Sequence, residues 1–423
     1  MTTQKLNWIR EISRGDFVNI RRMIKLRFII SLIVLILLII LSTYFNLALN
    51  KNVSNILEYK KISKSLNTKD NGITFDDLNK VKEKYKELTF TGYKETLCDV
   101  KNKYGNSPGK KAKTKMVLTD ENYFSLYPYK MIAGGKIDFL SVENGNKIVV
   151  ISDVLANDLF KSTKVVGNII SLNDENYKIV GVYRENQSFA YSISEDAYER
   201  VYVPYTSYST KNKNESLFLD IFSTRETAKT TYKNINNNLS RTLGGGLSLY
   251  SIVNYTTLKK ISFQYTRIFY FIIGICGIIL LIKIALKYFK SLAAFFKEKL
   301  KTNYFGEILR NNKKEIFFTS SKILLCLASI IIIFSLIKFN ITIDNKYLPN
   351  DNIFEISFYR KTYFENMQLK NANESGFSNV YDRYITNVTN IEKIILLGEI
   401  ISFIILMVDG KLLLMLKSKK KNK

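Results

Sequence analysis

Residues 28–49 read FIISLIVLILLIILSTYFNLAL and contain no charged side chain. At about 1.5 Å per residue, a helix of this length matches the roughly 30 Å hydrocarbon core of a bilayer. The stretch is longer than the apolar core of a signal peptide, and it lacks a small-residue cleavage site. We therefore expect residues 28–49 to form the first transmembrane helix and to stay attached to the protein.

Three further apolar stretches extend this pattern along the chain. The second, residues 267–289, is mostly apolar, and the third, residues 321–339, is built around a wholly apolar run. The fourth, residues 391–408, is interrupted by Glu392, Lys393 and Glu399 but has a membrane-like centre. Together they predict a domain of four transmembrane helices.

The distribution of charge predicts how these helices are oriented. The chain carries 63 Lys and Arg against 37 Asp and Glu, a net charge of +26. Residues 1–27, 283–322 and 409–423 carry net charges of +5, +7 and +5, whereas residues 51–266 carry +9 and residues 338–390 are neutral. Short basic segments beside membrane spans stay in the cytoplasm. The excess charge therefore indicates cytoplasmic termini in a multi-pass cell-membrane protein, not a nucleic-acid partner.

Composition also argues against most catalytic and metal chemistry. The chain has no histidine, which is the commonest general base and metal ligand. Cys98, Cys276 and Cys326 are too scattered for a zinc site or a disulfide framework. Residues 105–111 superficially resemble a phosphate-binding loop but are one residue short and end in Lys. We therefore expect no enzyme activity, no catalytic, cofactor or metal site, and no cofactor of the chain's own.

The long segment between the first two spans predicts an α+β domain. Thr74 and Asp77 favour a capped helix start, and residues 50–66 are predicted to be a helical stalk leaving the membrane. Alternating apolar residues then indicate a series of short strands. After them the chain is predicted to return to the membrane through a second helical stalk at about residues 248–289. The predicted strands are residues 147–152, 168–172, 177–183, 200–205 and 216–223, with helices at 153–160 and 225–243.

Several motifs in this segment resemble a known family. Val117–Phe124 with Ala133-Gly134-Gly135 resembles the start of the extracytoplasmic core domain of MacB-like ABC transporter permeases, a group that includes FtsX-like proteins. The order of the motifs that follow is also similar to that family, and one outer domain after the first of four spans matches its plan. The later motifs are Ile148–Ser152, Leu155–Phe160, Val166–Ile170, Tyr177–Val182 and Val201–Pro204.

The chain departs from the family at three places, one of which is the tail, where the proline-containing motif common after the family's last span is absent. In the cytoplasmic loop, Asn303–Arg310 keeps the Gly and the Ile-Leu-Arg of the family motif but lacks its leading acidic residue. The outer loop before the last span is long for the family. The resemblance therefore implies a divergent member.

With the resemblance, the whole chain divides into nine predicted segments. The N-terminal segment has apolar residues at helical spacing with Arg between them, which favours a helix lying on the inner leaflet, or alternatively a plain basic flank. The segments are a cytoplasmic amphipathic helix 1–27, transmembrane helices 28–49, 267–289, 321–339 and 391–408, a MacB-like core domain 50–266, a cytoplasmic coupling loop 290–320, an outer loop 340–390 and a basic tail 409–423.

The resemblance implies that ATP is used by a separate ABC ATPase subunit docking on the cytoplasmic loop. There we expect a helix over residues 297–316 whose apolar side chains insert into a groove of the partner, while the alternative is a surface helix contacting only lipid headgroups. The candidate contacts are Lys301, Phe305, Gly306, Glu307, Ile308, Leu309, Arg310, Lys313 and Lys314.

Glu399 is the candidate ionisable residue at membrane depth. Such a group usually faces protein or a water-lined cavity, which would give it a conformational or substrate-path role. In the alternative interpretation, which we slightly favour, the span starts later and Glu399 lies near the outer surface with Glu392 and Lys393.

The function that the resemblance implies is mechanical. A pair of permeases, homodimeric or heterodimeric, would pass ATP-driven motion through the stalks to the outer domains, which handle a peptide, a lipoprotein or an adaptor protein. Two other functions remain open: an FtsX-like regulator of an extracytoplasmic protein such as a cell-wall hydrolase, and a peptide-immunity protein. Membrane lipids are expected partners in all three, and nucleic acid in none.

Overall fold

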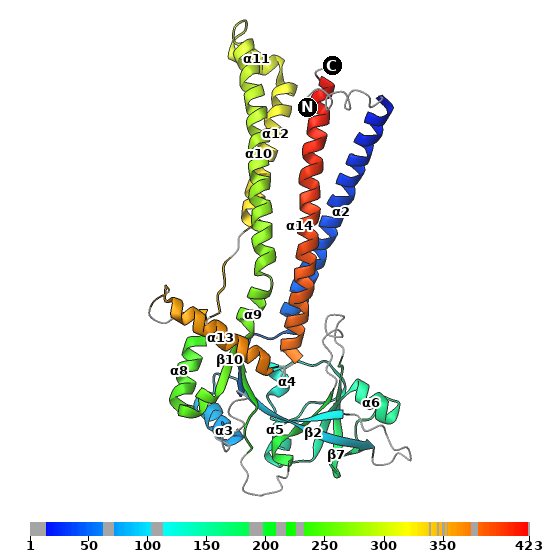
Figure 1. The fold of residues 1–423 in the computed structure, drawn as a ribbon, viewed down its shortest axis with the longest axis vertical. Coiled ribbons are helices and arrows are strands. Elements are labelled where there is room, and N and C mark those ends of the chain that lie inside the picture. Colours follow the sequence, from blue (N-terminus) through cyan, green and yellow to red (C-terminus); the bar gives the residue numbers. More distant parts are fainter. Residues whose placement is uncertain are drawn as a thin grey trace, which may run out of the picture. The chain divides into compact units, whose positions relative to one another are not determined.

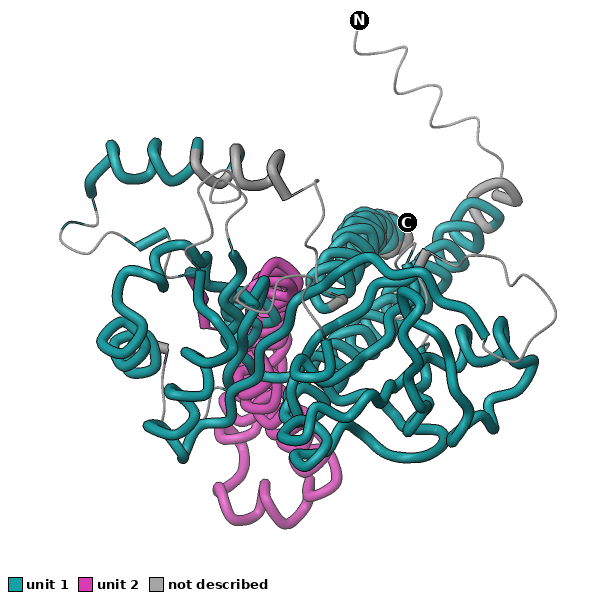
Figure 2. Tube along the Cα trace, turned by 90° about the horizontal axis from the view of Figure 1, so that it is seen from below, with its two compact units in different colours: residues 1–259, 344–423 teal, residues 260–343 magenta. Residues whose placement is uncertain are grey.

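The computed structural model describes most of the chain as two compact units. One comprises residues 1–259 with 344–423, and the other comprises residues 260–343 (Figure 2). The described residues are 14–61, 72–102, 113–185, 198–208, 217–225, 232–337, 340–344, 347–348, 352, 354–373 and 380–421. The stretch that resembles a phosphate loop and the first part of the predicted N-terminal amphipathic helix lie outside them.

The outer domain is built on a 10-stranded mixed sheet within the described part of the chain. Its order is β10-β1-β9-β2-β3-β8-β5-β7-β4, with β6 pairing with β2 and β7. The β3–β8 and β5–β7 pairs are parallel and the other pairs are antiparallel. The strands are β1 Ile56–Lys61, β2 Phe90–Asn102, β3 Lys113–Thr119, β4 Met131–Gly134, β5 Ile148–Ser152, β6 Ile169–Leu172, β7 Glu175–Tyr183, β8 Glu199–Pro204, β9 Ile221–Arg225 and β10 Tyr250–Asn254.

Short helices complete the domain, so the predicted α+β class is confirmed. The capping box at Thr74 is also confirmed: Thr74 Oγ1 accepts from the Asp77 backbone N at 3.2 Å, and Asp77 Oδ2 accepts from the Thr74 backbone N at 3.2 Å. The helices are α3 Phe75–Lys84, α4 Tyr123–Leu126, α5 Phe139–Glu143, α6 Asp153–Phe160, α8 Tyr232–Leu243 and α9 Tyr255–Ser262, with 3₁₀ turns η2 Tyr205–Ser207 and η3 Gly244–Leu249.

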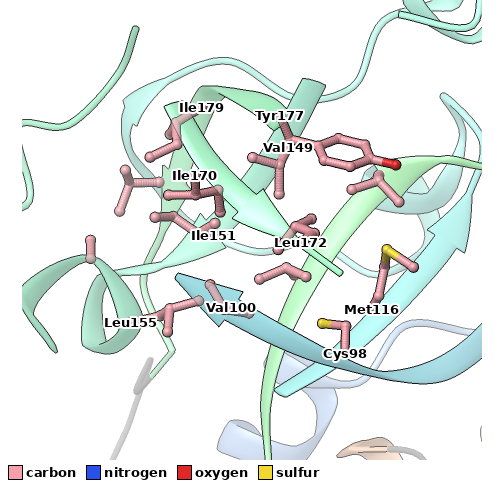
Figure 3. Close-up of a cluster of buried hydrophobic side chains, with 14 of the residues drawn as sticks. Cys98, Val100, Met116, Val149, Ile151, Leu155, Ile170, Leu172, Tyr177 and Ile179 are labelled. Atoms are coloured by element: carbon pink, nitrogen blue, oxygen red, sulfur yellow. The ribbon is translucent and has the colours of Figure 1, made fainter. Parts of the chain in front are cut away.

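Two clusters of buried apolar side chains hold the sheet to these helices. One cluster lies under α6 and includes Ile151 of β5, Leu155 of α6 and Ile179 of β7 (Figure 3). The other packs α3 and α8 against β1, β2 and β9. These clusters follow from the alternation of apolar residues along each strand, which is why four of the five predicted strands match β5 to β8. The start of the fifth predicted strand, residues 216–223, is wrong, because β9 begins at Ile221. The helix predicted over residues 225–243 corresponds to α8, which begins later, at Tyr232.

The predicted first stalk is wrong. Residues 56–61 form β1, which pairs with β9 on one side and β10 on the other. Both partners come from about 165 to 200 residues further along the chain, and pairing in a sheet overrides local helical periodicity. Only residues 53–55 separate the first long helix from the sheet.

Two long helices, α2 (Arg14–Asn52) and α14 (Val380–Lys421), lie side by side and antiparallel (Figure 1). The α2 helix is continuous from Arg14 to Asn52, so residues 14–27 are helical and join the first apolar stretch without a break. The rest of the predicted amphipathic helix 1–27 stays a prediction.

Three described helices are long and apolar enough to cross a membrane: residues 19–52 of α2, α10 (Gln264–Lys299) and α12 (Lys313–Leu336). The fourth predicted span lies inside α14, which is not among the three. The described chain therefore supports three spans by length and composition, and the four-helix domain stays a prediction.

The unit of residues 260–343 contains α10, α11 (Phe305–Asn311) and α12. The prediction of a single helix over residues 297–316 is wrong, because this segment contains parts of three helices. The α10 helix ends at Lys299, the backbone then turns, and only residue 312 separates the end of α11 from the start of α12. The predicted outer loop 340–390 also contains more helix than expected: α13 (Ile356–Asn373) and the first turns of α14.

Candidate functional site

The connection between α2 and the sheet is short, and a side chain of α9 forms hydrogen bonds with it. The ammonium of Lys259, on α9, donates to the carbonyl oxygen of Val53 at 2.7 Å and to Asn55 Oδ1 at 2.6 Å. Lys259 is buried, and burial lowers the pKa of its ammonium. Lys259 thus ties the short segment between α2 and β1 to α9.

Charged side chains of β1 meet the start of α14 at this junction. Glu58 and Lys60 are two residues apart, so they lie on the same face of the strand. The Glu58 side chain is fully buried, and its Oε1 lies 3.3 Å from Lys60 Nζ. Lys60 also forms an ion pair and hydrogen bond with Asp382 of α14. One lysine thus bridges a strand carboxylate and a helix carboxylate.

Two buried tyrosines complete the hydrogen bonding of these carboxylates. Tyr127, which follows α4, donates to Glu58 Oε2 at 2.7 Å, and its hydroxyl lies 2.6 Å from Ser223 Oγ on β9. Tyr255, at the start of α9, has its hydroxyl 2.8 Å from Asp382 Oδ1 and 3.3 Å from Glu58 Oε1. The Tyr381 ring packs against both tyrosines, with centroid distances of 5.2 and 5.6 Å.

The electrostatics of the junction fix its protonation. Burial lowers the pKa of Lys60, but the carboxylates of Glu58 and Asp382 outweigh burial and leave that pKa above its ordinary value. Burial, followed by the neighbouring carboxylates, raises the pKa of Tyr127 and Tyr255 well above the ordinary value. At neutral pH the lysine is charged and both phenols are neutral donors. We call Glu58, Lys60, Tyr127, Tyr255 and Asp382 the junction cluster.

Polar contacts continue along the interface of α2 and α14. Glu399 is fully buried in this pair of helices, and neighbouring Gly398 allows close packing, since an added Cβ would lie 3.1 Å from Leu38. Glu399 thus faces protein, and its conformational or substrate-path role stays a prediction. The contacts are the Arg27–Asp409 ion pair, Ser31 Oγ to the Ser402 carbonyl at 2.8 Å, Ser42 Oγ to Glu392 Oε1 at 2.5 Å and Asn52 Nδ2 to the Tyr384 hydroxyl at 2.8 Å.

The predicted ATPase contacts are only partly available at the surface. Ile308 is fully buried within its own unit, so it cannot insert into a partner. Phe305 and Leu309 are exposed, and the Phe305 ring stacks on Phe296 with centroids 5.6 Å apart. The remaining candidates are also exposed: Lys301, Gly306, Glu307, Arg310, Lys313 and Lys314.

The junction cluster was not predicted from the sequence, because its members come from β1, the end of α4, α9 and α14. The only local signal is a Tyr-Asp-Arg-Tyr stretch at residues 381–384, just before the fourth apolar segment. Among the residues that the structure describes, no group of three or more His, Cys, Asp or Glu side chains is placed to hold a metal ion.

Comparison with known proteins agrees with this architecture. Residues 28–233 match the family described as the MacB-like periplasmic core domain. The outer part of this chain is similar to the MacB-like periplasmic core domain. With three apolar helices, the chain is a membrane protein with an extracytoplasmic domain, similar to MacB-like ABC transporter permeases.

The individual relatives are distant. The chain is 27% identical over 86 residues to the uncharacterized ABC transporter permease YvrN of Bacillus subtilis, covering 20% of this chain and 21% of that relative. The periplasmic region of MacB from Actinobacillus actinomycetemcomitans is 15% identical, with 50% of this chain and 94% of that one covered and a TM-score of 0.40. The extracellular domain of the noncanonic ABC-type transporter YknZ from Gram-positive bacteria is 15% identical, with 47% and 100% covered and a TM-score of 0.36.

Proposed function

We propose that this chain is the permease subunit of a MacB-like ABC transporter that couples ATP hydrolysis by a separate ATPase to movement of its outer domain. The observation that carries the proposal is the junction cluster, through which Lys60 of the sheet binds Asp382 of α14. A MacB-like core domain joined directly to two long helices is suited to transmitting motion, with a peptide, lipoprotein or adaptor as the object handled outside.

In this mechanism α2 and α14 act together. Their polar contacts from Arg27–Asp409 to Asn52–Tyr384 make them move as a pair, and the short segment 53–55 passes that movement to β1. Domain motions in proteins occur as rigid bodies about short connecting segments. The junction cluster makes the sheet move together with α14, because Lys60 of β1 is paired with Asp382.

The proposal includes α14 as the fourth membrane span, with both chain termini in the cytoplasm. An ionisable residue at membrane depth is tolerated when it faces protein. Glu392 and Glu399 are both buried, and Glu392 accepts a hydrogen bond from Ser42 of the spanning helix α2. The two carboxylates that interrupt the apolar stretch thus face protein, whereas Lys393, the third charge in it, is exposed.

The ATPase is proposed to dock on α11 and the turn before it. Phe305 and Leu309 are exposed apolar residues on one short helix, and exposed basic residues surround them. An apolar anchor with a charged rim is a common arrangement for a helix in a partner's groove.

A pull-down of the tagged chain from native membranes tests this function. The expected result is co-purification of a protein with an ABC ATPase sequence, identified by mass spectrometry. The Leu309→Asp variant is expected to reduce the retained ATPase at least about tenfold, since a charge buried at an anchor costs more than about 1.4 kcal/mol.

The matched control is Phe139→Asp, a similar change at an exposed apolar residue of α5 in the outer domain, and ATPase retention is expected to be unaffected. Absence of any ABC ATPase from the wild-type eluate would overturn the proposal and leave the peptide-immunity function. Equal loss in both variants would remove α11 as the docking site.

A further inference from the structure

Helix α13 carries an apolar face that the proposed function does not use. Its exposed apolar residues recur at helical spacing along one face, and the residue that opens the face, Ile356, is 82% exposed. Phe358 and Thr362, on the opposite face, are partly or fully buried. The exposed face consists of Ile356, Tyr359, Tyr363, Phe364 and Met367, preceded by Phe354.

The chemistry of this face is that of a bilayer interface. Tyr and other aromatic rings concentrate at the boundary between headgroups and acyl chains, where an apolar ring and a polar tip are both accommodated. Arg360 lies on the same arc of the helix, and a long basic side chain can reach lipid phosphates while its stem stays in apolar surroundings. A face exposed to water throughout would leave these large apolar side chains unprotected.

The chain holds α13 near the bilayer. Six residues, 374–379, separate its end at Asn373 from the start of α14 at Val380, a reach of at most about 25 Å. Tyr384, one turn into α14, binds Asn52 at the end of α2, only three residues beyond the apolar run that ends at Leu49. Figure 1 shows α13 running across the direction of α14 and not along it.

We propose that α13 is an interfacial helix whose exposed face is embedded in the leaflet on the side of the outer domain, with phospholipid as its partner. Interfacial helices bury their apolar face at the boundary between headgroups and acyl chains. The contact would fix the outer domain to the membrane surface at a point separate from α2 and α14. This inference does not depend on an ATPase partner.

Tryptophan fluorescence of the full chain tests the proposal in phosphatidylcholine bilayers. The chain has one Trp, Trp8, so Trp8→Phe provides a background into which Tyr363→Trp is introduced. Replacing ordinary lipid by phosphatidylcholine brominated near the top of the acyl chain is expected to lower the emission roughly twofold, because an embedded face lies about 5–10 Å into the interface, beside the bromines.

Two matched controls use the same background. Phe358→Trp places the probe on the inward face of α13, and Leu97→Trp places it on β2, at a residue 67% exposed. Emission from both is expected to change little with brominated lipid. Phe364→Trp replaces Tyr363→Trp as the probe if that variant fails to elute as a monodisperse protein.

Two results would overturn the proposal. In one, the Tyr363→Trp probe responds to brominated lipid no more than the Leu97→Trp probe, and acrylamide in the water quenches it strongly, which places the face in water. In the other, neither quencher reaches the probe, which means that protein covers the face. Neither result bears on ATPase retention, so the two proposals fail separately.

Discussion

At the scale of single residues, Glu58 is the centre of the junction cluster. It is a fully buried carboxylate that interacts with Lys60, Tyr127 and Tyr255. A buried charge is tolerated only when it is paired and hydrogen-bonded. Nothing in the local sequence around Glu58 distinguishes it from an exposed residue, since its partners come from distant elements.

Glu58→Ala removes the carboxylate acceptor of Tyr127, the more distant of the two acceptors of Tyr255 and one of the two carboxylates beside Lys60. Because breaking a buried pair usually costs 3–5 kcal/mol and Lys60 keeps Asp382, the expected loss of stability is about 2–4 kcal/mol. The measurement is the thermal unfolding midpoint of the detergent-solubilised chain. The control is Glu143→Ala, at an exposed residue of α5. Equal midpoints for the two variants would contradict the structural role of Glu58.

A partly buried carboxylate, Asp220, gives a prediction about pH. Burial raises its pKa to about 6, although the Glu95 backbone N donates to it. The folded protein therefore binds the proton more tightly than the unfolded chain, and the stability contributed by Asp220 falls as pH rises from about 4 to about 6.

Asp220→Asn keeps an acceptor for the Glu95 backbone N and cannot ionise. The variant is expected to match the wild type near pH 4 and to exceed it at pH 7.5 by an amount on the order of 2 kcal/mol. Unfolding midpoints measured from pH 4 to 8 check this. A difference that is constant across the range would show that ionisation of Asp220 is not its cause.

At the scale of elements, helices and strands differ in how well the sequence predicts them. The strands β5 to β8 and the helix α6 follow from local alternation and capping, such as Ser152 accepting from the Leu155 backbone N at 3.0 Å. The β1 strand could not be predicted this way, because its partners β9 and β10 come from far along the chain. Two residues of the junction cluster lie on β1, so the site could not be predicted without predicting that strand and its distant partners.

The pairing of α2 with α14 gives a prediction about cross-linking. Ser31 and Ser402 are in hydrogen-bond contact across the helices, so Ser31→Cys with Ser402→Cys, in a background without the three native cysteines, is expected to form a disulfide on mild oxidation. Leu37→Cys with Ser402→Cys is the control, since Leu37 is 59% exposed on α2. A mobility shift on non-reducing gels reports the bond, and cross-linking only in the control pair would refute the observed register.

At the scale of the whole molecule, charge and hydropathy predicted an outer α+β domain and long apolar helices. They did not predict that the first and last long helices pair and contact the sheet, because Asp382 and Asp409 lie 322 and 382 residues along the chain from Lys60 and Arg27, their partners. Their role exists only where Lys60 and Arg27 are brought beside them. We propose that this connection carries motion from the membrane to the outer domain.

Amide hydrogen exchange of the purified permease–ATPase complex tests that claim most directly. Between the nucleotide-free and vanadate-trapped states, exchange is expected to change in β1 and in the first turns of α14. In Asp382→Asn the change in β1 is expected to shrink while ATP hydrolysis continues, because Lys60 loses its ionic partner on α14. Changes confined to the cytoplasmic segments, with β1 identical in both states of the wild type, would contradict the claim.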